Sequence, residues 1–207
     1  MRLKVTQIIT LFLVLVGISA CSPIIKSFYG IKKPQPLDDE QISKYAEKLK
    51  LPAADVYRID TSYLTFILSL DTAKFKSERK NHYQPLQALY FDRSGNPISF
   101  HVNCYAGGFP NLKWNRNGNF DTFPPKTQAP LDSILSLERL LDFIRPLTAS
   151  REFNFAQYDY VVVVFWNRFM KRQSKRLIRT VQENHRLDTI KSVKVIYIND
   201  DNLFAAE

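Results

Sequence analysis

The densest hydrophobic run of the chain covers residues 159–166, where four consecutive valines precede Phe165 and Trp166. Such a run has no polar face, and it is typical of a strand buried on both faces in the middle of a parallel sheet. Apolar residues at helical spacing follow over 168–186, and a second β-rich run covers 192–198. Strand, helix and strand in this order predict a parallel βαβ unit.

Upstream of this unit, the pattern predicts a β-hairpin and a helix. Two β-rich runs, 86–92 and 98–104, flank a turn that contains Gly and Asn. Apolar positions at helical spacing over 132–145 predict a helix that Pro146 ends. Together with the strand at 98–104, these elements follow the order βαβαβ. We therefore predict an α/β fold with a mixed sheet around a βαβαβ core.

The amino-terminal part of the predicted domain adds helices and one short strand. A capping-box pattern at Asp38 starts a predicted helix that Pro52 closes. A short strand is predicted over 55–60. The apolar run at 62–70 fits both the helical period and the strand period. We favour a buried helix because apolar residues recur three and four positions apart. The polar, basic stretch 72–84 predicts an exposed loop.

Residues 105–130 form the least regular stretch, rich in glycine, asparagine, proline and aromatic residues. A loop of this length is uncommon in a compact domain unless it is functional or held down by its own side chains. The aromatic residues either fold it onto the domain or line a ligand site. Ligands of α/β sheets gather beyond the carboxyl ends of parallel strands. In the second case, the pocket would contain His101, Cys104, Trp114 and Asn115.

The amino terminus has the pattern of a secretory signal over residues 1–20. Two basic residues come first, an apolar run covers 8–16, and small residues follow. The tetrad Ile18-Ser19-Ala20-Cys21 resembles the lipobox of bacterial lipoproteins. The resemblance implies cleavage before Cys21 and acylation of that cysteine. A plain secretory signal and an uncleaved anchor are the alternatives.

A lipidated Cys21 would hold the protein on a membrane of the cell envelope, because two or three acyl chains bind stably where one does not. Ser22 after the cysteine favours, by analogy, the outer membrane, facing the periplasm or the cell surface. The proline-containing stretch 21–37 reads as a tether, and 38–207 as a single domain. Cys104 would then be a free, buried thiol without a disulfide partner.

Residues 161–167 resemble the central strand of thioredoxin-fold proteins, in which an apolar run ends in Phe-Trp before the redox motif. The helix that follows and the strand over 194–199 also fit, so the resemblance covers roughly residues 160–199. The resemblance implies a thioredoxin-like arrangement. Where that family carries its Cys-x-x-Cys motif, this chain reads Met170-Lys171-Arg172-Gln173. Thiol–disulfide exchange requires a thiolate, so such a domain would lack redox activity here.

Patterns for other catalytic chemistry are missing from the sequence. His82 and His185 have no His, Cys or carboxylate partner at metal-ligand spacing, and no phosphate-binding loop or nucleophile elbow occurs. Asp200 and Asp201 follow a predicted strand, where helix capping or a solvated loop accounts for them. We predict no metal, no cofactor and no assembled catalytic set.

The chain is basic, with a formal net charge of +9, and much of this charge falls on one side of the predicted helix 168–186. The opposite, apolar side must cover the sheet, so the basic side faces outward. It is either a solvated face or a dock for anionic lipid or an acidic envelope protein. Nucleic acid is not expected as a partner of an exported protein. The basic residues are Arg168, Lys171, Arg172, Lys175, Arg176 and Arg179.

These features favour a lipid-anchored cell-envelope protein with a non-catalytic binding or structural role at the membrane. The alternative is a small-molecule-binding or enzymatic α/β domain that uses the 105–130 loop. A role as a partner or immunity-type protein is compatible with the same features.

Overall fold

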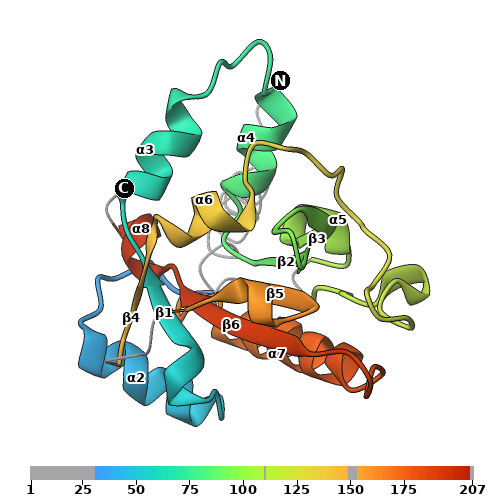
Figure 1. The fold of residues 1–207 in the computed structure, drawn as a ribbon. Helices are drawn as coiled ribbons and strands as arrows, with labels where there is room; N and C mark the ends of the chain where they lie inside the picture. The colour runs from blue at the N-terminus through green and yellow to red at the C-terminus, as the bar shows by residue number, and fades with distance from the viewer. Residues whose placement is uncertain (1–30, 110, 149–152, 206–207) are drawn as a thin grey trace, which may run out of the picture.

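A computed structural model describes residues 31–109, 111–148 and 153–205. Six strands form one mixed sheet in the order β3-β2-β5-β6-β1-β4, and helices cover both of its faces (Figure 1). The predicted α/β fold with a mixed sheet is confirmed.

The strands are β1 (Val56–Ile59), β2 (Gln87–Asp92), β3 (Pro97–Val102), β4 (Ile144–Pro146), β5 (Tyr160–Trp166) and β6 (Val193–Asn199). The helices are α2 (Asp39–Lys48), α3 (Ser62–Ser69), α4 (Lys76–His82), α5 (Asn103–Ala106), α6 (Leu137–Leu141), α7 (Lys171–His185) and α8 (Asp201–Ala205). Three short 3-10 turns are η1 (Ala53–Asp55), η2 (Arg116–Gly118) and η3 (Phe155–Gln157).

Strand β5 lies inside the sheet and is buried on both faces, as predicted. The side chains of its four valines are 0% exposed. Val162 and Val164 pack into the core under α2 and α7, and Val161 and Val163 pack into the core under α3 and α6. The sheet is parallel on only one side of this strand, because β6 pairs with β5 in parallel whereas β2 pairs with it antiparallel.

The βαβ unit formed by β5, α7 and β6 is confirmed. The two strands pair in parallel along their whole length, from Tyr160 opposite Val193 to Trp166 opposite Asn199. Helix α7 begins three residues later than the predicted 168, because the turn before it is held by side-chain hydrogen bonds. The Ser174 hydroxyl accepts from the Asn167 amide at 3.1 Å and donates to the Asn167 carbonyl at 2.8 Å.

The hairpin of β2 and β3 is also confirmed, but its second strand is shorter than predicted. The Asn103 amide donates to the Leu86 carbonyl at 3.1 Å, and the Asn103 side-chain oxygen accepts from the Leu86 amide at 3.3 Å. These bonds end the ladder, and α5 starts at once. Cys104 therefore lies on a helical turn and is exposed, so the prediction of a buried thiol is wrong.

The amino-terminal elements match the predicted helix, strand and helix. Asp38 and Gln41 form the reciprocal bonds of a capping box at the start of α2, and β1 follows. The run at 62–70 is helical, as favoured, but only partly buried: Ile67 is in the core, whereas Leu68 is 51% exposed.

Two predictions of local structure are wrong. The stretch 72–84 is not an exposed loop, because α4 forms within it and its last residue, His82, is buried. The helix over 132–145 is reduced to the single turn of α6, so this half of the predicted βαβαβ core does not form as expected. Residues from Ile144 instead form β4, an edge strand paired antiparallel with β1. Pro146 is tolerated there because an edge strand leaves one side of its backbone unpaired.

Because β5 is buried on both faces, we expect valines on either face to lose similar stability when they are replaced by alanine. We expect Val162→Ala and Val163→Ala each to lower the free energy of unfolding by about 2 kcal/mol, because each change removes buried methyl groups and leaves a cavity. Val193→Ala, at a half-buried position of β6, should cost less. Urea unfolding monitored by circular dichroism measures all three. A nearly neutral effect of either β5 variant would mean that one face of the strand is open.

Candidate functional site

The outer side of α7 is the most strongly charged surface feature among the described helices. Leu177, Ile178 and Val181 on its inner side are buried against the sheet. The side chains on the opposite side are exposed, and Arg168 at the preceding turn is half-buried. The exposed basic residues of this outer face are Lys171, Arg172, Lys175, Arg176 and Arg179.

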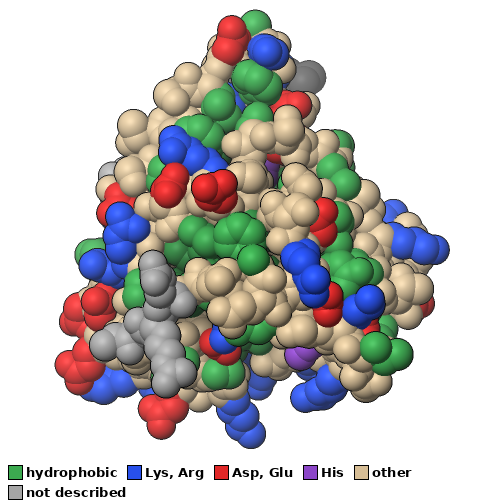
Figure 2. Space-filling view, viewed as in Figure 1, with side chains coloured by type: hydrophobic (Ala, Val, Ile, Leu, Met, Phe, Trp, Pro, Cys, Tyr) green, Lys and Arg blue, Asp and Glu red, His purple; other side chains and the backbone are tan. Residues whose placement is uncertain are grey.

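Charge on α7 is not balanced within the helix. Glu183 is its one acidic residue, and it pairs with Arg179 at 2.8 Å. On α2, which covers the same face of the sheet, acidic and basic residues nearly cancel, and Glu40 pairs with Lys44. Figure 2 shows acidic side chains over α2 at the lower left and basic side chains along the lower edge of the view. Of the two helices α2 and α7, α7 therefore carries the basic excess.

The chain enters the described domain beside the amino-terminal end of α7. The Lys32 amide donates to the Phe169 carbonyl at 2.8 Å, just before α7 begins. Leu37 is buried, and its amide donates to the Asn202 side chain at 2.6 Å. The last part of the predicted tether 21–37 thus contacts the domain. Cys21 itself lies outside the described residues.

A pair of buried carboxylates lies at the carboxyl end of β6. Asp200 and Asp201 are 1% and 0% exposed, so a solvated loop does not account for them, whereas helix capping, the other expectation, fits their place at the start of α8. Asn167, at the end of β5, donates to Asp200 at 3.0 Å, and the Arg168 amide donates to Asp201 at 2.7 Å. Burial raises the pKa of both carboxyl groups, and these hydrogen bonds oppose the rise. The pair joins the turn before α7 to the start of α8.

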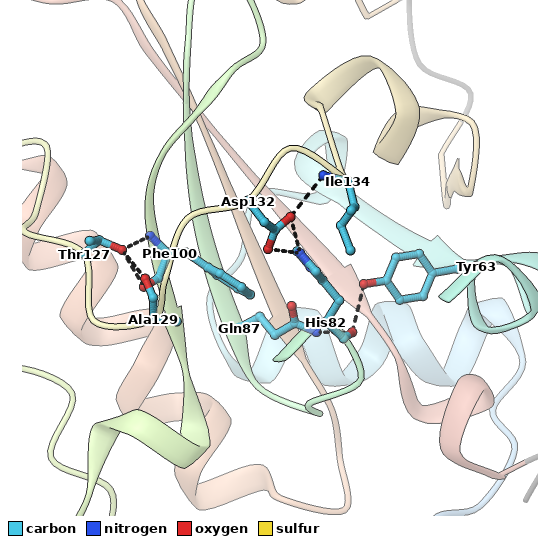
Figure 3. A network of polar contacts seen from close by, with 8 residues as sticks. All are labelled: Tyr63, His82, Gln87, Phe100, Thr127, Ala129, Asp132 and Ile134. Atoms are coloured by element: carbon cyan, nitrogen blue, oxygen red, sulfur yellow. Dashed lines mark hydrogen bonds and ion pairs between the residues drawn. The ribbon is translucent and has the colours of Figure 1, made fainter. Parts of the chain in front are cut away.

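His82 and Asp132 form a second buried polar pair that the sequence did not predict (Figure 3). The imidazole Nε2 lies 3.0 and 3.2 Å from the two carboxylate oxygens, and the ring stacks on Phe100 at 4.8 Å between centroids. The His82 carbonyl accepts from Tyr63 and Gln87, both at 2.9 Å.

This pair has the chemistry of a base and its orienting carboxylate, but it is enclosed. The His82 side chain is only 2% exposed. Among the described residues, its ring is hydrogen-bonded to no hydroxyl or thiol that could act as a nucleophile. The His82–Asp132 pair has a structural role, because it connects α4 to the segment that leads into α6.

The four residues predicted to line a pocket lie in two kinds of environment. Trp114 is 2% exposed in the core, and His101 is buried against Phe120, with 4.2 Å between ring centroids. Burial lowers the pKa of His101 to about 4, so the ring is neutral at physiological pH. Cys104 and Asn115 are at the surface. Partial desolvation raises the pKa of the Cys104 thiol, which lowers its reactivity.

The 105–130 loop is held down by its own side chains. Phe123 packs edge-to-face against Tyr90 and Tyr160. The Asn115 side chain accepts from the Phe120 amide at 2.9 Å and donates to Asp121 at 2.8 Å. Of the two alternatives for the aromatic residues of this loop, the structure favours packing onto the domain.

Within the described ranges, no group of three or more His, Cys, Asp or Glu side chains is placed to hold a metal ion. Helices long and apolar enough to cross a bilayer are likewise absent from residues 31–109, 111–148 and 153–205.

Comparison with known protein families, with curated proteins and with solved structures finds no match for this chain.

The buried Asp200 carboxyl predicts an unusual dependence of stability on pH. Its folded pKa is raised above the unfolded value of about 4, so the folded state holds the proton more tightly. This contribution to stability is present below that value and is lost as the pH rises towards the raised pKa. We expect Asp200→Asn to make the free energy of unfolding fall less between pH 4 and 7 than it does in the native protein.

Asp188 is the matched control, because backbone hydrogen bonds lower its pKa and reverse the sign. Asp188→Asn should remove stability that is present above the ordinary carboxyl pKa. Urea unfolding at several pH values measures both variants. Parallel pH profiles of native protein and Asp200→Asn would show that Asp200 ionises as readily when folded as when unfolded.

Proposed function

We propose that the chain is a lipid-anchored protein of the bacterial cell envelope whose domain rests on an anionic membrane surface through the outer face of α7. The role is one of binding or structure and not of catalysis. The observation that carries the proposal is the unbalanced basic face of α7, which begins beside the point where the chain enters the domain.

The length of chain before the domain supports this arrangement. Ten residues lie between Cys21 and Lys32, and the eleven Cα–Cα steps that join these two residues span at most about 40 Å when fully extended. Helix α7 is about 22 Å long and starts next to Lys32. An anchor at Cys21 would therefore keep the whole outer face of α7 within reach of the same bilayer.

The binding energies of the lipid anchor and of the basic helix serve different purposes. Two or three acyl chains on Cys21 supply stable attachment. Each basic residue near an anionic surface adds about 1 kcal/mol, and salt screens this attraction. The helix therefore sets the orientation of the domain on the membrane, and the lipid holds it there.

The thioredoxin-like arrangement remains part of the proposal. The parallel β5–α7–β6 unit is compatible with it. At the place where that family carries its two cysteines, Met170 and Gln173 are buried, and the Gln173 side chain accepts from the Leu112 amide at 3.3 Å. In this proposal, Gln173 stands where the family has a redox cysteine and instead holds the 105–130 loop through its hydrogen bond with Leu112.

The lipid anchor is tested by removing the acylated side chain. Cys21→Ala should move the protein from the membrane fraction to the soluble fraction of lysed cells, because the remaining electrostatic attraction is screened at physiological salt. Cys104→Ala, which alters the exposed thiol of α5, should leave the protein with the membranes. Immunoblots of sedimented envelopes measure both. Sedimentation of Cys21→Ala with the membranes after a salt wash would contradict the anchor.

The docking face is tested by comparing two variants that each lose three positive charges, one in α7 and the other in and beside α4. The variant Lys171→Gln/Lys175→Gln/Arg176→Gln neutralises the outer face of α7. We expect it to bind vesicles of phosphatidylglycerol and phosphatidylcholine on the order of a hundredfold more weakly at low salt. Surface plasmon resonance on captured vesicles provides the measurement.

The control variant, Lys74→Gln/Lys76→Gln/Lys80→Gln, removes three exposed charges in and beside α4, which packs on α3. It should lose less than threefold in affinity. Equal losses in both variants would mean that net charge alone, and not the face of α7, drives binding. No binding by the native protein would overturn the docking proposal.

A further inference from the structure

A groove of about 610 Å³ lies at the carboxyl-terminal end of α7, apart from the outer face of that helix. The last turn of α7 forms one wall, the first half of β6 forms the floor, and the turn after α2 forms the opposite wall. A volume of this size is in the range of small-ligand sites. Its polar and charged lining includes Lys50, Asp55, Tyr158, Gln182, Arg186 and Lys194.

The floor of the groove is a fixed set of polar groups. Lys194 Nζ contacts Asp55 at 2.5 Å, and both side chains are mostly buried. The same ammonium lies 6.0 Å from the centre of the Tyr158 ring. Gln182 donates to the Tyr197 hydroxyl at 3.3 Å. An ammonium has three N–H donors, so Lys194 retains donors for a ligand while it is paired with Asp55.

The walls add two cations. Lys50 and Arg186 have exposed side chains and no ion-pair partner among the described residues. With Lys194 set against Asp55 and with His185, which also lines the groove, counted as neutral, the groove has a formal excess of two positive charges. This is the charge of one phosphate monoester with the sign reversed.

Lys50 also occupies a backbone position that a lysine rarely adopts. Its φ is +59°, and it ends α2 in a Schellman motif: its amide donates to the Glu47 carbonyl at 2.8 Å, and the next amide donates to the Ala46 carbonyl at 3.0 Å. Glycine or asparagine is the usual residue there. A lysine at this strained position places an ammonium on the wall of the groove, which motivates a role for the side chain.

Two exposed apolar side chains follow Arg186 in the chain, and Leu187 faces a separate hollow that Asn115 and Thr180 also line. Leu187 and Ile190, just after Arg186, are 56% and 90% exposed. Apolar side chains next to basic ones, at the tip of a turn, are suited to the boundary between lipid headgroups and acyl chains.

We propose that this groove binds a phosphate monoester, whose phosphate lies between Lys50, Arg186 and Lys194. The inference rests on the proposed membrane role only for the source of the ligand. In a lipid such as phosphatidic acid, the acyl part would extend beyond Arg186 towards the exposed Ile190. A soluble phosphate ester would use the cations alone.

Two kinds of probe distinguish these sources. The first is glycerol 3-phosphate, titrated calorimetrically into the purified full-length protein in detergent, with glycerol as the uncharged comparison. The second is a phosphatidylcholine vesicle that contains either phosphatidic acid or phosphatidylglycerol, matched for total charge. Phosphatidic acid has a monoester phosphate, and phosphatidylglycerol has a diester.

The variant Lys50→Asn/Arg186→Gln removes both unpaired cations and relieves the strained φ of residue 50, so it should fold. We expect at least a tenfold loss of affinity for whichever monoester the native protein binds. Lys74→Gln/Lys76→Gln removes the same charge from a segment outside both the groove and the outer face of α7, and it should change monoester affinity less than twofold. Thermal unfolding confirms that both variants are folded.

Each result decides one question. Binding of glycerol 3-phosphate, or a preference for phosphatidic acid over phosphatidylglycerol, supports the groove if Lys50→Asn/Arg186→Gln abolishes it. Binding of neither monoester, or equal losses in the two variants, overturns the groove. The soluble arm involves no membrane, so it can succeed while the docking proposal for α7 fails, and the reverse also holds.

Discussion

The burial of β5 on both faces is the constraint on which the rest of this structure depends. Its four valines belong to two different cores, so helices must cover the sheet on both sides. Both edges of the strand are also occupied, by β2 and β6. Polar groups can therefore approach the strand only at its ends, and Asn167 and Asp200 meet at its carboxyl end. The same geometry makes α7 a cover for the sheet on one side and a charged surface on the other.

Elements whose signal lies within a few residues of sequence were predictable. The run of valines, the helical spacing of α7, the Gly-Asn turn of the hairpin and the capping box at Asp38 depend on local periodicity and turn chemistry. The predictions of an exposed loop over 72–84 and of a helix over 132–145 are wrong, because contacts with distant parts of the chain determine the structure of both stretches. His82 is buried by its pair with Asp132, and Ile144 is drawn into strand pairing with β1.

The candidate surfaces divide in the same way. The outer face of α7 follows from periodicity once the inner face is known to be apolar. The His82–Asp132 pair joins residues 50 positions apart, and the groove combines the turn after α2 with the start of β6, so neither leaves a local signature. The burial of Asp200 likewise leaves no local signature, because its partner Asn167 follows β5 and lies 33 positions earlier in the chain.

The central claim is that the outer face of α7 lies against an anionic bilayer. Acetylation of lysines on the vesicle-bound, full-length protein, mapped by mass spectrometry, tests it without any substitution. If α7 faces the lipid, Lys171 and Lys175 lose reactivity when phosphatidylglycerol vesicles are added, whereas Lys74 and Lys76 near α4 react as before. Equal reactivity of all four lysines with and without vesicles, at saturating binding, would contradict this orientation.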